Sequence, residues 1–226
     1  MSTSQRRLAT MATLSALVLV AVSGCGGGNR TPASTKASTS PPSSSTGQTY
    51  TTKAFKVPLT VTVDPYLGSP PTIDSPNLLS WDASISTEKV RFLVPVKLYR
   101  PDSATPEPPP KDYLKYLQGL AKHGVEFSNV STVSVDGHPG SLMTATSDID
   151  KIPAGSLNGT LGCATPAATK TTEGDCFGVV PDLLLRIAVV KVGGTALVAW
   201  ARTRKDEPNE AFFAVFDRML RSVRLR

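Results

Sequence analysis

Residues 183–203 read LLLRIAVVKVGGTALVAWART, two long apolar runs on either side of Gly193-Gly194. Two glycines between β-branched and aliphatic runs are typical of the tight turn that joins two antiparallel strands. Both faces of each run are mostly apolar, whereas a strand with one face in water alternates with polar residues. The sequence therefore predicts strands over 183–192 and 195–203, central in a sheet and covered by helices.

Three segments upstream of this hairpin repeat with a period of two. Residues 59–63, 79–86 and 92–98 carry apolar side chains at every second position, the pattern of half-buried strands. Pro95 lies inside the third segment and has no N–H to donate to a neighbouring strand. We therefore expect this segment to form an edge strand or to contain a bulge.

Two other segments have the helical period. Residues 111–123 place their large apolar side chains on one face, and Gly124 follows as a stop signal. Residues 206–220 open with two acids and Pro208, which are favoured in a first helical turn, and carry an apolar stripe from Phe212 to Leu220. Each segment predicts a helix with one buried face.

The remaining segments complete the order of elements. Residues 127–135 and 142–146 flank a group of turn residues and predict a second hairpin. The last residues, 222–225, either add an edge strand or lie on the surface. Three strands, a helix, two hairpins and a helix indicate an α+β fold, an antiparallel β-sheet with helices packed on it, within a single domain of residues 50–226.

The amino terminus has the features of an export signal. Arg6 and Arg7 precede a short apolar core, and Val22-Ser23-Gly24-Cys25 resembles the lipobox of bacterial lipoproteins. In those proteins the signal, here residues 1–24, is removed and the cysteine carries diacylglycerol and fatty acyl chains such as palmitate. The resemblance implies that Cys25 anchors the mature protein to the extracytoplasmic side of the cell membrane; the alternative is an ordinary signal with a coincidental cysteine.

Residues 25–49 form the predicted connection between anchor and domain. Gly, Ser, Thr and Pro dominate the segment, and it lacks aromatic residues, so it cannot bury enough apolar surface to offset the entropy of ordering. We expect a flexible tether with an end-to-end distance of roughly 25–30 Å.

Cys163 and Cys176 are the two cysteines left after Cys25. They bracket a polar loop containing Gly and Pro, and an exported chain meets an oxidising compartment. The spacing therefore predicts a disulfide; a metal pair or a nucleophilic cysteine are the alternatives, but neither has partners nearby in the sequence.

The formal net charge of +6 does not mark the domain as basic. Four of the 24 Lys and Arg residues precede Thr49, which leaves 20 bases against 18 acids and a net charge of +2. Nucleic-acid binding needs a concentrated positive field along the phosphate backbone. We therefore expect no nucleic-acid partner.

The pieces together resemble a known family. These pieces are the lipobox at Cys25, the polar tether, the helix at 113–121, the turn at 135–139 before Leu142, and the ending FDRMLRSVR at 216–224. They resemble actinobacterial, chiefly mycobacterial, secreted lipoproteins of the LpqN/LpqT type. The resemblance covers roughly residues 50–226 and implies a Mog1/PsbP-like fold, an envelope location and a non-catalytic binding or assembly role. The segment that holds the two cysteines departs from the family.

Candidate functional residues follow from the same resemblance and from the aromatic content. An envelope lipid, glycolipid or protein partner is the implied ligand of a monomeric domain, and Trp81, Tyr99 and Trp200 are the aromatic residues best suited to line a cleft. The sequence indicates no enzyme, cofactor or metal. The alternatives are an envelope hydrolase that uses His138, Asp148 or Asp150 as acid or base, and a structural spacer without a ligand.

The anchor assignment yields the first prediction. Cys25→Ser removes the thiol that would be acylated, so the variant is expected to leave the membrane fraction, because the buried acyl chains supply the binding energy. Fractionation and intact-mass measurement test this, with Ser23→Ala as a control that keeps Cys25. Full membrane association of Cys25→Ser would contradict the assignment.

Overall fold

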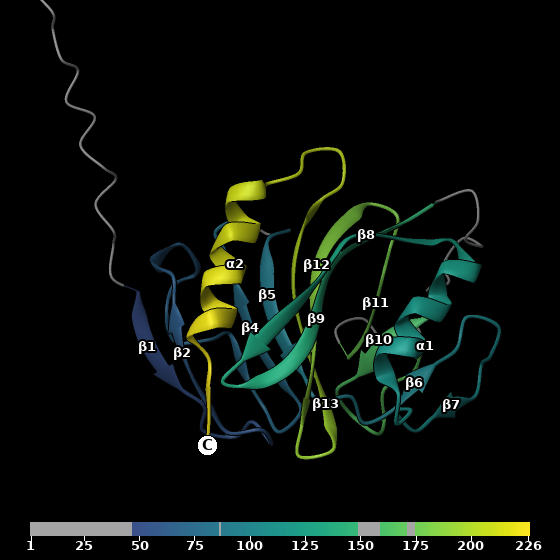
Figure 1. The fold of residues 1–226 in the computed structure, drawn as a ribbon, viewed down its shortest axis with the longest axis horizontal. Coiled ribbons are helices and arrows are strands. Elements are labelled where there is room, and N and C mark those ends of the chain that lie inside the picture. Colours follow the sequence, from purple (N-terminus) through teal and green to yellow (C-terminus); the bar gives the residue numbers. More distant parts are fainter. Residues whose placement is uncertain (1–46, 86, 149–158, 171–174) are drawn as a thin grey trace, which may run out of the picture. The chain divides into compact units, whose positions relative to one another are not determined.

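The hairpin of residues 183–203 lies at the middle of a seven-stranded antiparallel sheet in the computed structural model (Figure 1). Its strands are β12, Leu183–Val192, and β13, Thr195–Arg204, which pair along their whole length. Gly193 and Gly194 have φ values of 55° and 84°, in the region that a tight hairpin turn requires. The predicted hairpin and its central position are confirmed.

The structure describes residues 47–85, 87–148, 159–170 and 175–226. All of them belong to one unit, Ser43–Arg226. The signal segment, Cys25, most of the tether and Asp150 lie outside the described residues. Within the described ranges, no helix is long and apolar enough to cross a membrane.

The strand order in the large sheet is β3-β4-β5-β13-β12-β9-β8. The five strands beside the hairpin are β3 (Ile73–Asp74), β4 (Leu78–Asp82), β5 (Lys89–Leu93), β8 (Val125–Val135) and β9 (His138–Ser147). The strand pairs β8–β9 and β4–β5 are both antiparallel. The second predicted hairpin, formed by β8 and β9, is therefore confirmed.

Two expectations about the first strands are wrong. β4 is buried on both faces, Ser80 and Trp81 alike, because β3 and β5 flank it and both sheet faces are covered. β5 ends at Leu93 and lies between β4 and β13, so it is neither an edge strand nor bulged at Pro95. Pro95 lies beyond the strand, where the chain leaves the sheet.

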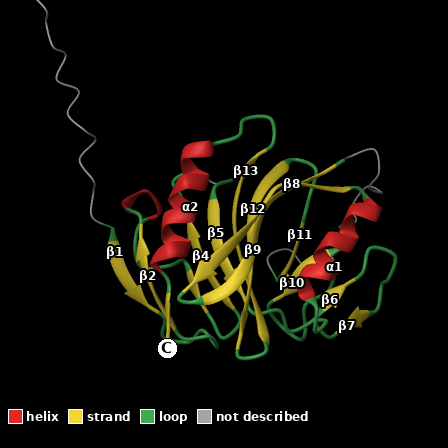
Figure 2. Ribbon diagram, viewed as in Figure 1, coloured by secondary structure: helices red, strands yellow, loops and turns green. Residues whose placement is uncertain are grey.

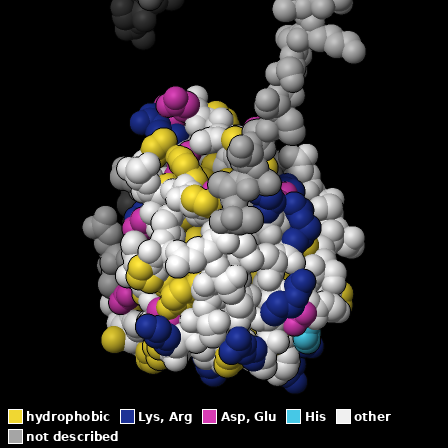
Figure 3. Space-filling view, turned by 90° about the vertical axis from the view of Figure 1, so that its left-hand side faces the viewer, with side chains coloured by type: hydrophobic (Ala, Val, Ile, Leu, Met, Phe, Trp, Pro, Cys, Tyr) yellow, Lys and Arg dark blue, Asp and Glu magenta, His cyan; other side chains and the backbone are white. Residues whose placement is uncertain are grey.

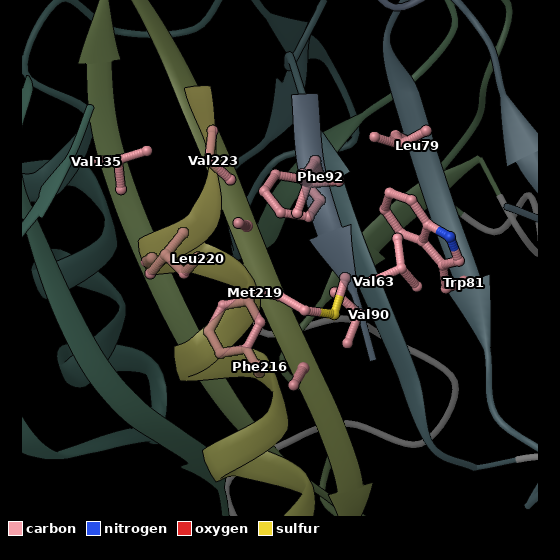
Figure 4. Close-up of a cluster of buried hydrophobic side chains, with 14 of the residues drawn as sticks. Val63, Leu79, Trp81, Val90, Phe92, Val135, Phe216, Met219, Leu220 and Val223 are labelled. Carbon is pink, nitrogen blue, oxygen red and sulfur yellow. The ribbon is translucent and has the colours of Figure 1, made fainter. Parts of the chain in front are cut away.

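Helix α2, Glu210–Ser222, covers one face of the sheet. Its apolar stripe packs on strand residues in a single core, and Figure 4 shows Met219 pointing toward Val90. The helix begins later than predicted because the Asn209 side chain accepts a hydrogen bond from the Phe212 N–H at 3.0 Å and caps it there.

A small sheet extends this covered side. It consists of β1 (Gln48–Thr51), β2 (Leu59–Val63) and β14 (Arg224–Leu225), in the order β1-β2-β14, and a short 3-10 helix, η1 (Pro65–Leu67), follows β2. The strand at the carboxyl end confirms the edge-strand alternative, and β1 begins two residues before the expected boundary at 50. Figure 3 shows the side carrying β1 and β2, with basic and acidic side chains interspersed.

The opposite face of the sheet is covered in pieces. Helix α1, Tyr113–Gly119, continues into η2, Leu120–His123, and buries Leu117 and Leu120 against Met143 and Ile187 of the sheet. The other pieces are the short strand pairs β6 (Leu98–Tyr99) with β7 (Pro106–Glu107) and β10 (Thr160–Cys163) with β11 (Cys176–Gly178). Figure 2 shows the two helices separated by the strands. The fold is α+β as predicted, but helices cover this second face only in part.

The predicted disulfide is present. Cys163 and Cys176 are register partners on β10 and β11, with their Cα atoms 4.0 Å apart. The bond therefore joins the two strands of one small hairpin beside Tyr99 and Ala168.

Asp74 in β3 connects the small sheet to the large one. Its carboxylate accepts hydrogen bonds from the Tyr50 hydroxyl at 2.7 Å, the Lys53 N–H at 2.7 Å and the Ala54 N–H at 3.3 Å. Partial burial alone would raise the pKa of Asp74, but these hydrogen bonds outweigh it and hold the pKa below its ordinary value. Burial, followed by the bond to Asp74, raises the pKa of Tyr50 to about 12.

The lowered pKa of Asp74 predicts a pH-dependent contribution to stability. A depressed folded-state pKa stabilises the fold above the unfolded-state pKa, and this contribution is lost as the pH falls through the folded-state value. Asp74→Asn is therefore expected to lower the free energy of unfolding at neutral pH, with a gap to wild type that closes below about pH 4. Urea unfolding over a pH series tests this, with exposed Glu126→Gln as the control; a gap independent of pH would contradict it.

Candidate ligand-binding groove

The three aromatic residues expected to line a cleft lie in three different places. Trp81 belongs to the core under α2, Trp200 to the core on the opposite face, and Tyr99 to the cluster around the disulfide. All three are buried. The structure does not bring them together at one cavity.

Each of these residues has a packing role where it lies. The Trp200 ring is 5.1 Å from the Phe177 ring, and the Trp81 ring packs against Tyr50 and Phe92. The Tyr99 hydroxyl donates to the Ala168 carbonyl at 3.2 Å. These contacts are those of core residues.

The residues of the hydrolase hypothesis are also far apart. His138 begins β9 and Asp148 directly follows its last residue, so a ten-residue strand, on the order of 30 Å long, separates them. An acid and a base acting on one substrate must both be within hydrogen-bond reach of it. His138 and Asp148 cannot form such a pair, and Asp150 lies outside the described residues.

A groove of about 930 Å³ opens on a different part of the molecule. Its lining comes from Lys56 between β1 and β2, the loop at 94–96, residues 109–114 at the start of α1, residues 139–141 of β9, and both sides of the β12–β13 turn. Its apolar lining includes Val94, Val96, Pro109, Pro110, Leu114 and Val189. The volume is within the range of pockets that hold small ligands.

Close backbone packing shapes one wall of the groove. At Gly140, a Cβ atom would lie 2.5 Å from the carbonyl oxygen of Val189 on the adjacent strand. A side chain there would force the two strands apart, so a glycine is required for β9 and β12 to meet at this wall.

The charged residues of the groove are mostly basic. Lys56, Lys111 and Lys191 line it together with one acid, Asp112. The Asp112 carboxylate already accepts the Lys115 N–H at 3.0 Å as the cap of α1, whereas the structure shows no ion pair from the three lysines to any described residue. The groove therefore combines apolar walls with a net positive charge, three lysines against one carboxylate.

Tyr113 adds an unused hydrogen-bonding group. It lines the groove, and its buried hydroxyl has no hydrogen-bond partner among the described residues. Burial, with a further effect from Tyr116, raises the pKa of Tyr113 well above its ordinary range, so the hydroxyl is a neutral donor. The hydroxyl is buried in the core under α1, so it belongs to the groove wall and is not open to a ligand.

These residues were not singled out as a site by the sequence. Tyr113 lies in the apolar helical pattern of residues 111–123 and Lys191 in the apolar run of residues 183–192, so neither stands out in the sequence. Lys56, Lys111 and Lys191 are 55 to 135 residues apart, and no local motif links them. Among the described residues there is also no group of three or more His, Cys, Asp or Glu side chains that could hold a metal.

Comparison with known proteins gives matches at the level of structure only. No protein-family profile and no curated protein matches the sequence. A Pseudomonas aeruginosa protein of unknown function is 13% identical, over 80% of this chain and 99% of its own, with a TM-score of 0.39. The Saccharomyces cerevisiae Ran-binding protein Mog1p is 10% identical, over 79% and 96%, with a TM-score of 0.38. Cyanobacterial PsbP from Synechocystis is 11% identical, over 80% and 93%, with a TM-score of 0.39.

The TM-scores of these neighbours lie below 0.5, so the likeness carries no inference about the family of this chain. Identities of this size carry no inference about partners or activity. The function has to be argued from this chain's own residues.

Two tyrosines on α1 give a matched prediction. Tyr113→Phe removes a buried hydroxyl that has no partner, so it is expected to raise the free energy of unfolding by about 1 kcal/mol. Tyr116→Phe removes a hydroxyl that donates to the Thr160 carbonyl at 2.8 Å, so it is expected to lower the free energy by about 1 kcal/mol. Urea unfolding of both variants measures the difference. Equal destabilisation by the two would show that the Tyr113 hydroxyl has a partner.

Proposed function

We propose that the protein is a non-catalytic, lipid-anchored lipoprotein of a bacterial cell envelope, of the LpqN/LpqT type, whose domain binds an anionic amphiphile in the groove. The observation that carries the ligand class is the groove itself. Its walls are apolar, and it is lined by three lysines that make no ion pair with any described residue. The lipobox at Cys25 and the tether support the location.

The chemistry of the groove favours an amphiphile over a fully polar ligand. Apolar ligand surface gains roughly 25 cal/mol for each Å² that leaves water, which the valine and proline walls provide. The lysine ammonium groups then attract a phosphate or carboxylate head group. Because lysine is a flexible point charge, this arrangement favours negative charge without fixing one head-group geometry.

A single ligand also fits the dimensions better than a protein partner. A stable protein interface buries on the order of 800 Å² on each side and is nearly flat, whereas the groove is a concave site of ligand size. The anchor would keep the groove close to the membrane from which such amphiphiles come, because the tether spans only roughly 25–30 Å.

Charge reversal at the groove tests this function. Lys111→Glu combined with Lys191→Glu is expected to weaken the affinity of the full chain for dodecyl phosphate by about ten-fold or more, because both charges lie at the groove. Binding of neutral dodecyl maltoside is expected to change little. Isothermal titration calorimetry with both detergents below their micelle concentrations measures the two affinities.

The matched control carries the same change of charge outside the groove. Lys122→Glu with Arg221→Glu alters two exposed residues that do not line it. Equal losses in both double variants would indicate attraction to the overall charge and would contradict a groove site, as would failure of the wild-type chain to bind dodecyl phosphate.

A further inference from the structure

A second group of charged residues lies on the large sheet, on the face opposite α2. The strand register places Asp82, Lys89 and Arg202 in one row across β4, β5 and β13, and Ser80, Arg91 and Trp200 in the adjacent row. Trp200 belongs to the core on the α1 side. Alternate residues of a strand share a face. The side chains of Lys89, Arg91 and Arg202 therefore lie on the same face as Trp200 and point away from α2.

The three cations share one nearby carboxylate. Lys89 Nζ lies 2.6 Å from Asp82, and this pair is half-buried. Arg91 and Arg202 make no ion pair with any described residue. The cluster therefore carries an excess of two positive charges.

Within the described part of the chain, each of the two arginines donates a hydrogen bond through Nε only. Arg91 donates through Nε to the Ser80 hydroxyl at 3.4 Å, and Arg202 donates through Nε to the Thr87 carbonyl at 3.1 Å. Neither side chain makes a further hydrogen bond within the described residues. Their terminal nitrogens are not among the buried atoms that lack partners, so solvent can reach them.

Phe177 holds one of these guanidinium groups in place. The Arg91 guanidinium carbon lies 4.6 Å from the centre of the Phe177 ring, and Phe177 directly follows Cys176 of the disulfide in β11. Stacking on an aromatic ring orients a guanidinium and leaves its edge free to donate. The disulfide-linked hairpin thus supplies one wall of the cluster.

The excess positive charge of Lys89, Arg91 and Arg202 over Asp82 lowers the stability of the fold when no anion is bound. Burial, followed by the charge of Arg202, lowers the pKa of Arg91 to about 10, so the side chain remains a cation at neutral pH. Like charges held together at a half-buried position destabilise the fold. An anion between the two arginines would relieve this cost.

We propose that Arg91 and Arg202, supported by Lys89, bind a phosphate group. Two guanidinium edges with parallel N–H donors match the oxygens of a phosphate, free or ester-linked. The site shares no residue with the groove, so the two proposals can fail separately.

Inorganic phosphate is the first probe for the full chain. Titration at constant ionic strength, with chloride as the replaced anion, is expected to give saturable binding by calorimetry and a rise in the unfolding temperature. Arg202→Gln is expected to weaken phosphate binding by about ten-fold or more. Arg204→Gln is the matched control, because Arg204 lies two residues along the same strand but pairs with Asp206 and is exposed.

A second probe separates the two sources of phosphate. Phosphatidylcholine vesicles with and without phosphatidic acid test whether a lipid head group is bound. Binding of inorganic phosphate assigns a soluble ligand. Binding only to vesicles that contain phosphatidic acid assigns a lipid head group. Either result supports the proposal when the Arg202→Gln variant no longer binds that probe. Arg91→Lys, which keeps the charge but loses the paired donors, is expected to weaken binding as well and covers the case in which Arg202→Gln does not fold.

The proposal is overturned if the wild-type chain binds neither probe. It is also overturned if Arg202→Gln and Arg204→Gln reduce binding equally, since the anion would then respond to net charge. In that case the stacking on Phe177 would be the whole role of Arg91. Dodecyl phosphate is itself a phosphate ester, so its binding at the groove is judged from Lys111→Glu with Lys191→Glu, which leaves Arg91 and Arg202 in place.

Discussion

The architecture depends on the burial of both faces of the β12–β13 hairpin. Its side chains point alternately into two separate cores, Ala188 and Ala199 toward α2 and Ile187 and Trp200 toward α1. Neither face can be left in water, because each large apolar side chain contributes roughly 1.5–3 kcal/mol on burial. The other elements cover the two faces of this hairpin, and they cover each face differently.

One face is closed by a single continuous surface. The six buried side chains of α2 form one stripe, and the small sheet packs beside it. The other face is closed by a short helix and two short strand pairs, one of them joined by the disulfide. Separate pieces leave seams between them, and the groove opens where α1, β9 and the β12–β13 turn meet.

The sequence predicts the strands, the helices and the disulfide, but it does not predict which residues line the groove. Residues 183–203, the α1 segment and the cysteine pair each carry a local signal of period, stop residue or spacing, and each formed as predicted. A proline in an apolar run predicts an edge strand, whereas the structure ends β5 at Leu93, before Pro95. Aromatic content selected Trp81 and Trp200, but only the register shows that they face opposite sides of the sheet. Lys56, Lys111 and Lys191 meet only in the folded chain.

The uneven covering also explains where charge accumulates. A cation over a continuous apolar stripe would be fully desolvated, which is costly without a partner, and under α2 the half-buried Arg186 is accordingly paired with Asp217 at 3.3 Å. On the opposite face Arg91 and Arg202 lie at the margin of the covering, and within the described ranges neither forms an ion pair with a carboxylate. The same gaps that leave a groove therefore permit unpaired cations. Because α1 and two short strand pairs cover the second face, the fold can have both a groove and cations without ion pairs while the β12–β13 hairpin stays buried.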